Sequence, residues 1–299
     1  MTVRTRNRLI TFSILAGPFI FLFCLLFFWE AEPLPPVPPL PNPNGYDDLV
    51  KAGEMIKGDV GNYDEMGQAE LLAMTQTNSG ALQLARTGLQ KASRVPSRFS
   101  QDYMESHISD VTALKRLAQA WGIEGRLAAL ENHPEDAAKS YLEIIHLGNE
   151  SAYGGVLVDA MIGIAMESLG AEHLQELVDQ LDARSCRETA ARLDVLDSQR
   201  QTWDQVRQQE RDWSRRTFRG TRYELVRLME RSVTEKIFQS AGQSYQKQVG
   251  ITRQLIIEFA ARAYELEKGH RPANLNDLVP NYLKAIPKDP VTGRELNWN

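Results

Sequence analysis

Histidine and cysteine, which often take part in catalysis or metal binding, are few in this 299-residue chain and form no familiar catalytic pattern. No stretch has the spacing of a zinc-binding helix, a serine-hydrolase elbow or a phosphate-binding loop. The histidines are His107, His133, His146, His173 and His270. With Cys24 and Cys186 as its only cysteines, the chain has neither a disulfide framework nor a four-cysteine zinc site. We predict no catalytic residue, no metal ligand and no cofactor; the alternative is a hydrolase with dispersed catalytic residues.

One short stretch, Glu131-Asn132-His133-Pro134-Glu135, brings an imidazole close to two carboxylates. These side chains are possible metal ligands. The stretch lies where one predicted helix ends and the next begins at a proline, so we interpret it as a helix–helix turn.

Arginine has the most suggestive spacing. Residues 198–231 contain nine arginines and five acidic residues, and four of the arginines recur at every fourth position. These four are Arg207, Arg211, Arg215 and Arg219. Like charges at this spacing on a helix repel mildly. Together with Trp213 they predict a docking surface for an acidic partner, an anionic lipid or a polyanion. The alternative is a solvated helix whose arginines pair with acidic side chains elsewhere on the body.

The elements that position these residues begin with an uncharged run from Leu9 to Trp29. A helix of this length spans the roughly 30 Å hydrocarbon layer of a bilayer. Three arginines precede the run, and the first acidic residue, Glu30, follows it. The positive-inside rule then predicts a cytoplasmic tail over 1–8, a transmembrane helix over 9–29 and an extracytoplasmic body. Because no small-residue cleavage site follows the run, we expect an uncleaved anchor in a bacterial inner membrane.

The rest of the chain is more acidic than the net charge of −5 indicates, because three of the 34 basic residues precede the anchor and all 39 acidic residues follow it. Nucleic-acid binding depends on a basic surface, so we expect no nucleic-acid partner. We expect the membrane and other proteins as partners, and the oligomeric state stays open.

Residues 30–44 form a predicted spacer, because Pro33–Pro43 contains seven prolines in eleven residues. Such a stretch favours an extended polyproline II conformation, about 3.1 Å per residue, and excludes helix and sheet. It also resembles a ligand for an aromatic-lined groove, but we favour the spacer.

Residues 45–248 show helical hydrophobic periodicity without strand-like alternation, which predicts a mainly α body. We expect helices near 64–76, 79–93, 101–131, 134–148, 152–169 and 171–182, and a long one near 188–217. Short connections between them predict antiparallel neighbours.

One pair of these helices resembles the tetratricopeptide repeat. Trp121, Gly125, Ala137 and Tyr141 fall at the spacing of its W-x2-L-G and A-x3-F pattern. The small residues let two helices approach closely, and the aromatic residues fill the space beside them. The resemblance implies a tetratricopeptide-like array of helical hairpins.

Residues 249–299 are predicted to form a small helix-plus-turn module. Its helix ends at Gly269, and the segment LVPNYLKAIPKDP follows. This tail is similar to that of type II secretion major pseudopilins and of uncharacterised single-pass bacterial membrane-anchored proteins. However, Gly17 is followed by Pro18, and Leu22 occupies the position of the glutamate that pseudopilins carry.

These patterns together predict a mainly α, single-pass protein that is not an enzyme. We expect an extracytoplasmic scaffold or protein-interaction protein. The alternative is a component of a secretion machinery related to the pseudopilins.

Overall fold

The structure of this chain is a computed structural model that describes residues 34–218 and 221–297, with the backbone alone for residues 221–232. Within these ranges the regular elements are helical, and an isolated β-bridge joins Lys288 to Glu295. The mainly α prediction is therefore confirmed. The predicted anchor, residues 9–29, lies outside the described ranges. None of the helices inside those ranges combines the length and the apolar character that a membrane crossing needs.

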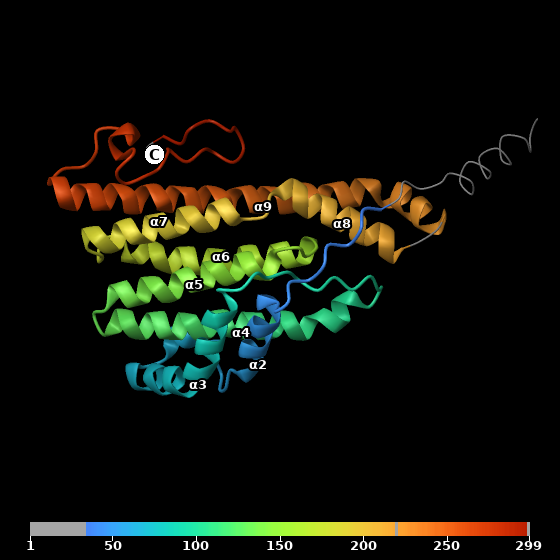
Figure 1. The fold of residues 1–299 in the computed structure, drawn as a ribbon, viewed down its shortest axis with the longest axis horizontal. Helices are drawn as coiled ribbons and strands as arrows, with labels where there is room; N and C mark the ends of the chain where they lie inside the picture. Colours follow the sequence, from blue (N-terminus) through green and yellow to red (C-terminus); the bar gives the residue numbers. More distant parts are fainter. Residues whose placement is uncertain (1–33, 219–220, 298–299) are drawn as a thin grey trace, which may run out of the picture.

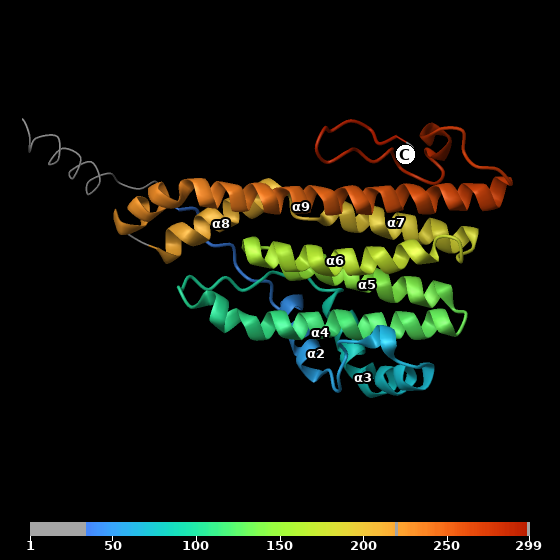
Figure 2. The ribbon, with the colours of Figure 1, turned by 180° about the vertical axis from the view of Figure 1, so that it is seen from behind.

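From α2 to α6 the helices pack side by side in their order along the chain, as Figures 1 and 2 show from opposite sides; beyond α6 the order changes, because α7 packs on α9 and α5, and α6 packs on α9. One edge of the stack is made by α2 and α3, the middle by α4, α5, α6 and α7, and the other edge by α9 with the C-terminal tail. The helices are α2 (Gly45–Met55), α3 (Gln68–Gly88), α4 (Tyr103–Leu130), α5 (Pro134–Ala152), α6 (Leu157–Leu177), α7 (Ala183–Gln199), α8 (Trp203–Thr217) and α9 (Thr221–Lys268), with 3-10 turns η1 (Tyr63–Glu65) and η2 (Leu275–Leu278).

Local chemistry sets most of the helix boundaries. The turn between α4 and α5 has Asn132 in the left-handed region, at φ 59°, and Pro134 as the first residue of α5. At the start of α7 the Asp182 side chain accepts a hydrogen bond from the Ser185 amide at 2.7 Å. At the end of α9, Gly269 has φ 78° and its amide bonds to the Glu265 carbonyl.

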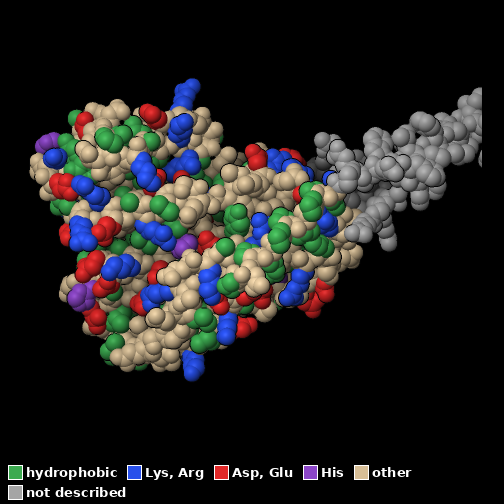
Figure 3. Space-filling view, viewed as in Figure 1, with side chains coloured by type: hydrophobic (Ala, Val, Ile, Leu, Met, Phe, Trp, Pro, Cys, Tyr) green, Lys and Arg blue, Asp and Glu red, His purple; other side chains and the backbone are tan. Residues whose placement is uncertain are grey.

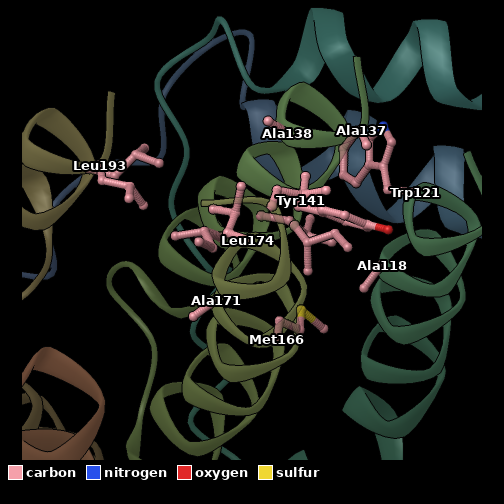
Figure 4. Packing of buried hydrophobic residues seen from close by; sticks show 14 of the residues in the cluster. Ala118, Trp121, Ala137, Ala138, Tyr141, Met166, Ala171, Leu174 and Leu193 are labelled. Atoms are coloured by element: carbon pink, nitrogen blue, oxygen red, sulfur yellow. The ribbon is translucent and has the colours of Figure 1, made fainter. Parts of the chain in front are cut away.

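The helices share one hydrophobic core, which continues from α2 to η2. Trp121 and Ala137 have no exposed surface and Tyr141 is 4% exposed, and all three lie at the packing of α4 against α5 (Figure 4). A Cβ on Gly125 would come within 2.4 Å of the Tyr141 ring. The predicted burial of the two aromatic residues beside small residues is therefore confirmed for this helix pair.

Several predicted helices are joined or divided in the structure. The two helices expected near 64–76 and 79–93 form the continuous α3, because Asn78 turns inward and bonds to the backbone of Lys57 instead of ending the helix. The two expected near 152–169 and 171–182 form α6, in which Gly170 packs closely on the Tyr141 carbonyl. The long helix expected near 188–217 is divided into α7 and α8 around Arg200.

The predicted boundary between residues 248 and 249 falls inside α9, which is continuous from Thr221 to Lys268. The C-terminal half of α9 buries Ile256 and Phe259 and packs on α7. The tail returns along α9, where the Tyr282 hydroxyl donates to Glu267 at 2.7 Å and the Arg187 guanidinium lies 4.5 Å from the centre of the Tyr282 ring.

Candidate partner-binding surface on α8

The helix α8 carries the predicted docking residues, and its first turn is fixed by a capping box. The Thr202 hydroxyl accepts a hydrogen bond from the Gln205 amide, and the Gln205 side chain accepts one from the Thr202 amide at 2.8 Å. Val206, one turn into the helix, is 3% exposed. The helix therefore has a defined inner face, and helical spacing places Arg211 and Arg215 on the opposite side.

The four arginines of the predicted stripe are not equivalent. Arg211 is exposed and donates to Gln208 at 2.7 Å, whereas Arg215 is partly buried. Arg207 lies at the side of α8, with its guanidinium 5.9 Å from the centre of the Phe238 ring of α9. Arg219 lies outside the described residues. The structure thus places Arg211 and Arg215 on one outer face and turns Arg207 toward the neighbouring helix.

Trp213 belongs to the inner side of α8. Its indole N–H donates to the Arg98 carbonyl at 2.9 Å, and its ring lies 5.6 Å from Tyr103 and 6.0 Å from Phe218. Trp213 therefore attaches α8 to the start of α4. Although Trp213 is close to the arginines in sequence, its side chain lies on a different face of α8 from Arg211.

Behind Trp213, a buried polar cluster joins α4 to α6. Asp159 is 2% exposed and accepts hydrogen bonds from the Tyr103 hydroxyl at 3.2 Å and the Val156 amide at 2.8 Å. Its other oxygen lies 2.6 Å from His107 Nε2, while the carboxylate of Asp110 lies 3.5 Å from Nδ1. Burial alone would lower the pKa of His107, but the hydrogen bonds and charges of both aspartates raise it above its ordinary value. The two carboxylates therefore favour the protonated form of the imidazole.

Glu210 connects the same region to α8. Its carboxylate accepts a hydrogen bond from the Leu157 amide at 2.8 Å, in the first turn of α6. Burial and the nearby charge of Asp159 raise the pKa of Glu210, and the bond from Leu157 opposes the rise. Two acidic side chains, Asp159 and Glu210, thus bind free amides at one helix start, as the helix dipole favours.

A second buried ionic cluster lies at the other end of α8. Arg200 pairs with Glu167, and their side chains are 6% and 4% exposed. Asp197 lies 3.5 Å from Arg200 and 2.8 Å from Arg253 of α9. Burial raises the pKa of Glu167, while the charge of Arg200 opposes this rise. The cluster alternates two cations with two anions and so joins α6, α7 and α9 without excess charge.

A cavity of about 20 Å³ beside this cluster is lined by Arg200, Gln201, Glu167 and Tyr245, among others. A space of this size holds about one water molecule. It therefore suits a hydration site for the ion pair and is too small for an organic substrate.

Of the possible metal ligands of the α4–α5 turn, His133 and Glu135 come together, but with Asp136 in place of Glu131. Ligand atoms of His133, Glu135 and Asp136 lie within 4.8 Å of one another, and all three residues are exposed. Lys139 donates to Asp136 at 2.7 Å, so an ammonium group already neutralises one of the carboxylates. We interpret this group as the charged first turn of α5.

Basic and acidic side chains are interspersed over the stacked helices on the face that Figure 3 shows. No protein-family model, curated protein or solved structure matches this chain.

Residue spacing could not have revealed the two buried clusters. Asp159 lies 52 positions from His107, and Arg200 lies 33 positions from Glu167. The one available signal was a charged residue inside an otherwise apolar stretch, as at Asp159 and Glu167 in α6.

Proposed function

We propose that this chain is a membrane-anchored scaffold, held by residues 9–29 in a bacterial inner membrane, that presents its stacked helices to other proteins outside the cytoplasm. The observation that carries this proposal is the order of the stack. From α2 to α6, helices that follow one another along the chain pack on one another, as in scaffolds that bind partners along an extended helical surface; beyond α6, α7 packs on α9 and α5. The resemblance of Trp121–Tyr141 to the tetratricopeptide pattern supports the same interpretation.

The placement of polar groups also favours a scaffold over an enzyme. His107 is 5% exposed and is held between two aspartates, and Glu167 is paired with Arg200 beneath the surface. These groups are already occupied in joining helices. A catalytic acid or base has to reach a substrate, so their burial supports a structural role.

The test places a photo-crosslinking residue at exposed positions of the full chain in native membranes. Ile108 of α4 is 65% exposed, and Leu72 of α3 is 42% exposed, so these positions sample two parts of the stack. We expect one recurring protein adduct from at least one of them. Gln180, an exposed residue between α6 and α7, serves as the comparison position. A scan of exposed positions on every helix that yields no recurring protein adduct contradicts the scaffold proposal.

Topology is tested separately by adding protease to spheroplasts. The anchor proposal expects digestion of the body while the N-terminal tail stays protected. A mature N-terminus beyond residue 30, or protection of the body, contradicts it.

A second candidate is a secretion component related to the pseudopilins, favoured by the ordered tail. The Asp289 carboxylate accepts hydrogen bonds from the Val291 and Thr292 amides at 3.0 and 2.6 Å, which closes a tight turn. The Asp289 amide also donates to the Arg294 carbonyl at 2.7 Å. Loss of a secretion phenotype on deletion of residues 270–299, with the helical body still folded, would favour this candidate over a general scaffold.

A further inference from the structure

One end of the molecule has a group of basic and aromatic side chains, all exposed except the partly buried Arg216, which we call the tip surface. It consists of Arg98, Phe99, Arg211, Arg216 and Phe218. The guanidinium of Arg216 lies 5.3 Å from the centre of the Phe99 ring. Trp213 connects the remaining parts, because it donates to the Arg98 carbonyl and its ring meets Phe218 edge-on. Arg98, Phe99, Arg216 and Phe218 are therefore contiguous, and Arg211 lies on the adjoining outer side of α8.

The arginines of the tip surface differ from most arginines of the body in their partners. Arg86, Arg187 and Arg253 each pair with a carboxylate at 2.5 to 2.8 Å. Among the described residues, Arg98, Arg211 and Arg216 form no ion pair with a carboxylate; Arg211 donates to Gln208 and Arg216 to the Pro35 carbonyl. The sequence allowed the arginines to be paired with acidic side chains of the body itself. Such internal pairing does not account for the three arginines of the tip surface.

Acidic residues near the tip surface are engaged with neutral donors. Asp102 accepts a hydrogen bond from the Ser100 hydroxyl, and Asp212 accepts one from Gln208 at 2.8 Å. They reduce the local positive charge without pairing with the tip arginines. The tip surface therefore stays basic on a chain whose net charge is −5.

The tip surface lies where the described chain leaves toward the predicted anchor. Arg216 donates to the Pro35 carbonyl, so the first described residues run beside the end of α8. Figure 1 shows this N-terminal stretch passing from α2 to the end of the molecule at which α8 and α9 meet. Only a few residues separate Pro35 from the end of the apolar run at Trp29.

We propose that the tip surface docks on the anionic phospholipid headgroups of the same membrane that holds the anchor. This inference rests on the proposed anchoring by residues 9–29. Arginine supplies charge for the phosphate groups, and exposed aromatic rings such as Phe99 and Phe218 suit the interfacial region of a bilayer. The contact of Arg216 with Pro35 keeps the start of the spacer at the end of α8. The stack of helices is thus held in one orientation and does not rotate freely on its spacer.

The experiment uses the full chain in nanodiscs of phosphatidylcholine alone or with added phosphatidylglycerol. A donor dye is attached at Met104→Cys, an exposed position in the first turn of α4, in a Cys24→Ala background; Cys186 is buried and escapes labelling. The acceptor is a headgroup-labelled lipid. We expect higher energy transfer in the anionic nanodiscs, and a decrease as salt is added.

Substitution then identifies the side chains responsible. Each basic side chain near an anionic surface contributes roughly a factor of five. Arg211→Gln with Arg216→Gln should therefore lower the ratio of docked to undocked molecules by about 25-fold. The matched control is Arg184→Gln with Arg192→Gln, which removes the same charge from exposed positions on α7. The control should leave the energy transfer unchanged.

The result of the nanodisc experiment distinguishes a failure of tip docking from a failure of the anchor proposal. Equal energy transfer in neutral and anionic nanodiscs, with the chain still co-purifying with the discs, overturns tip docking and leaves the anchor intact. A chain that fails to co-purify with either disc contradicts the anchor and the docking with it. An acidic protein as the occupant predicts transfer that does not depend on lipid charge, so that result also overturns the proposal.

Discussion

Replacement of Asp159 by alanine tests whether the buried cluster holds α4 and α6 together. The substitution removes hydrogen bonds from Tyr103 and the Val156 amide and leaves His107 without its closest carboxylate. A hydrogen bond to a charged group contributes about 1.5–3 kcal/mol, and breaking a buried ion pair costs about 3–5 kcal/mol. Because Asp110 still lies 3.5 Å from the imidazole, we expect the lower part of that range, roughly 3 kcal/mol.

The pH dependence follows from the raised pKa of His107. A group whose pKa is higher in the folded than in the unfolded state stabilises the fold at pH values below the unfolded-state pKa, which is 6.5 for His107. This stabilisation is lost as the pH rises through the pKa of the folded state. The destabilisation caused by His107→Gln should therefore be largest near about pH 6 and decrease toward alkaline pH.

The assay is urea unfolding of the full chain in detergent micelles, followed by far-ultraviolet circular dichroism at acidic and alkaline pH. Asp204→Ala, at an exposed position on α8, is the control for the removal of one negative charge. A free energy of unfolding for Asp159→Ala within about 1 kcal/mol of the control would refute the reasoning. So would a His107→Gln effect that increases with pH, because the imidazole would then not be held as a cation.

Three further expectations concern the free energy of unfolding, which the same assay measures. Gly53→Ala should lower it by more than about 2 kcal/mol, because the new Cβ would lie 2.1 Å from a backbone oxygen of α4, whereas Gly80→Ala, in open space on α3, should raise it by about 0.5–1 kcal/mol. Equal effects of the two substitutions would contradict the close approach of α2 and α4. Ala137→Leu should overpack the α4–α5 contact and cost about 1–3 kcal/mol, and an unchanged melting temperature would remove the packing argument. Glu167→Gln leaves a buried arginine without its main partner and should cost roughly 2–4 kcal/mol, while a neutral effect would show that the pair contributes little to stability.

Helical periodicity predicted the class of fold and most of the helices, since apolar spacing reports directly on the buried face. Boundaries at exposed turns were also close to those observed, as at Pro134, where a proline begins α5. The errors occurred where a tertiary contact overrode a local signal. The helix ends expected near residues 76 and 169 lie inside α3 and α6, where Asn78 bonds to the backbone of Lys57 and Gly170 packs on α5.

The break between α7 and α8 shows the opposite error. No glycine or proline interrupts residues 188–217, so local propensity favours one long helix. The structure ends α7 at Gln199, where Arg200 leaves the helix and its side chain reaches Glu167 of α6. Thr202 then begins α8 with its own capping box. The partner 33 positions away was invisible to any local pattern.

The same break decides how the arginines of α8 are presented. If residues 188–217 formed one helix, the arginines at every fourth position would lie on a continuation of the surface of α7. Instead α8 starts in a new direction beside the Arg200 cluster and is held near its other end by Trp213 on the Arg98 carbonyl. Within α8, Val206 and Trp213 form the inner side that packs on the body, so this packing does not depend on the charge of Arg211 on the outer side. Arg211 can therefore take part in binding without compromising the packing of α8, which is the physical condition that the proposed contact of the tip surface with anionic headgroups requires.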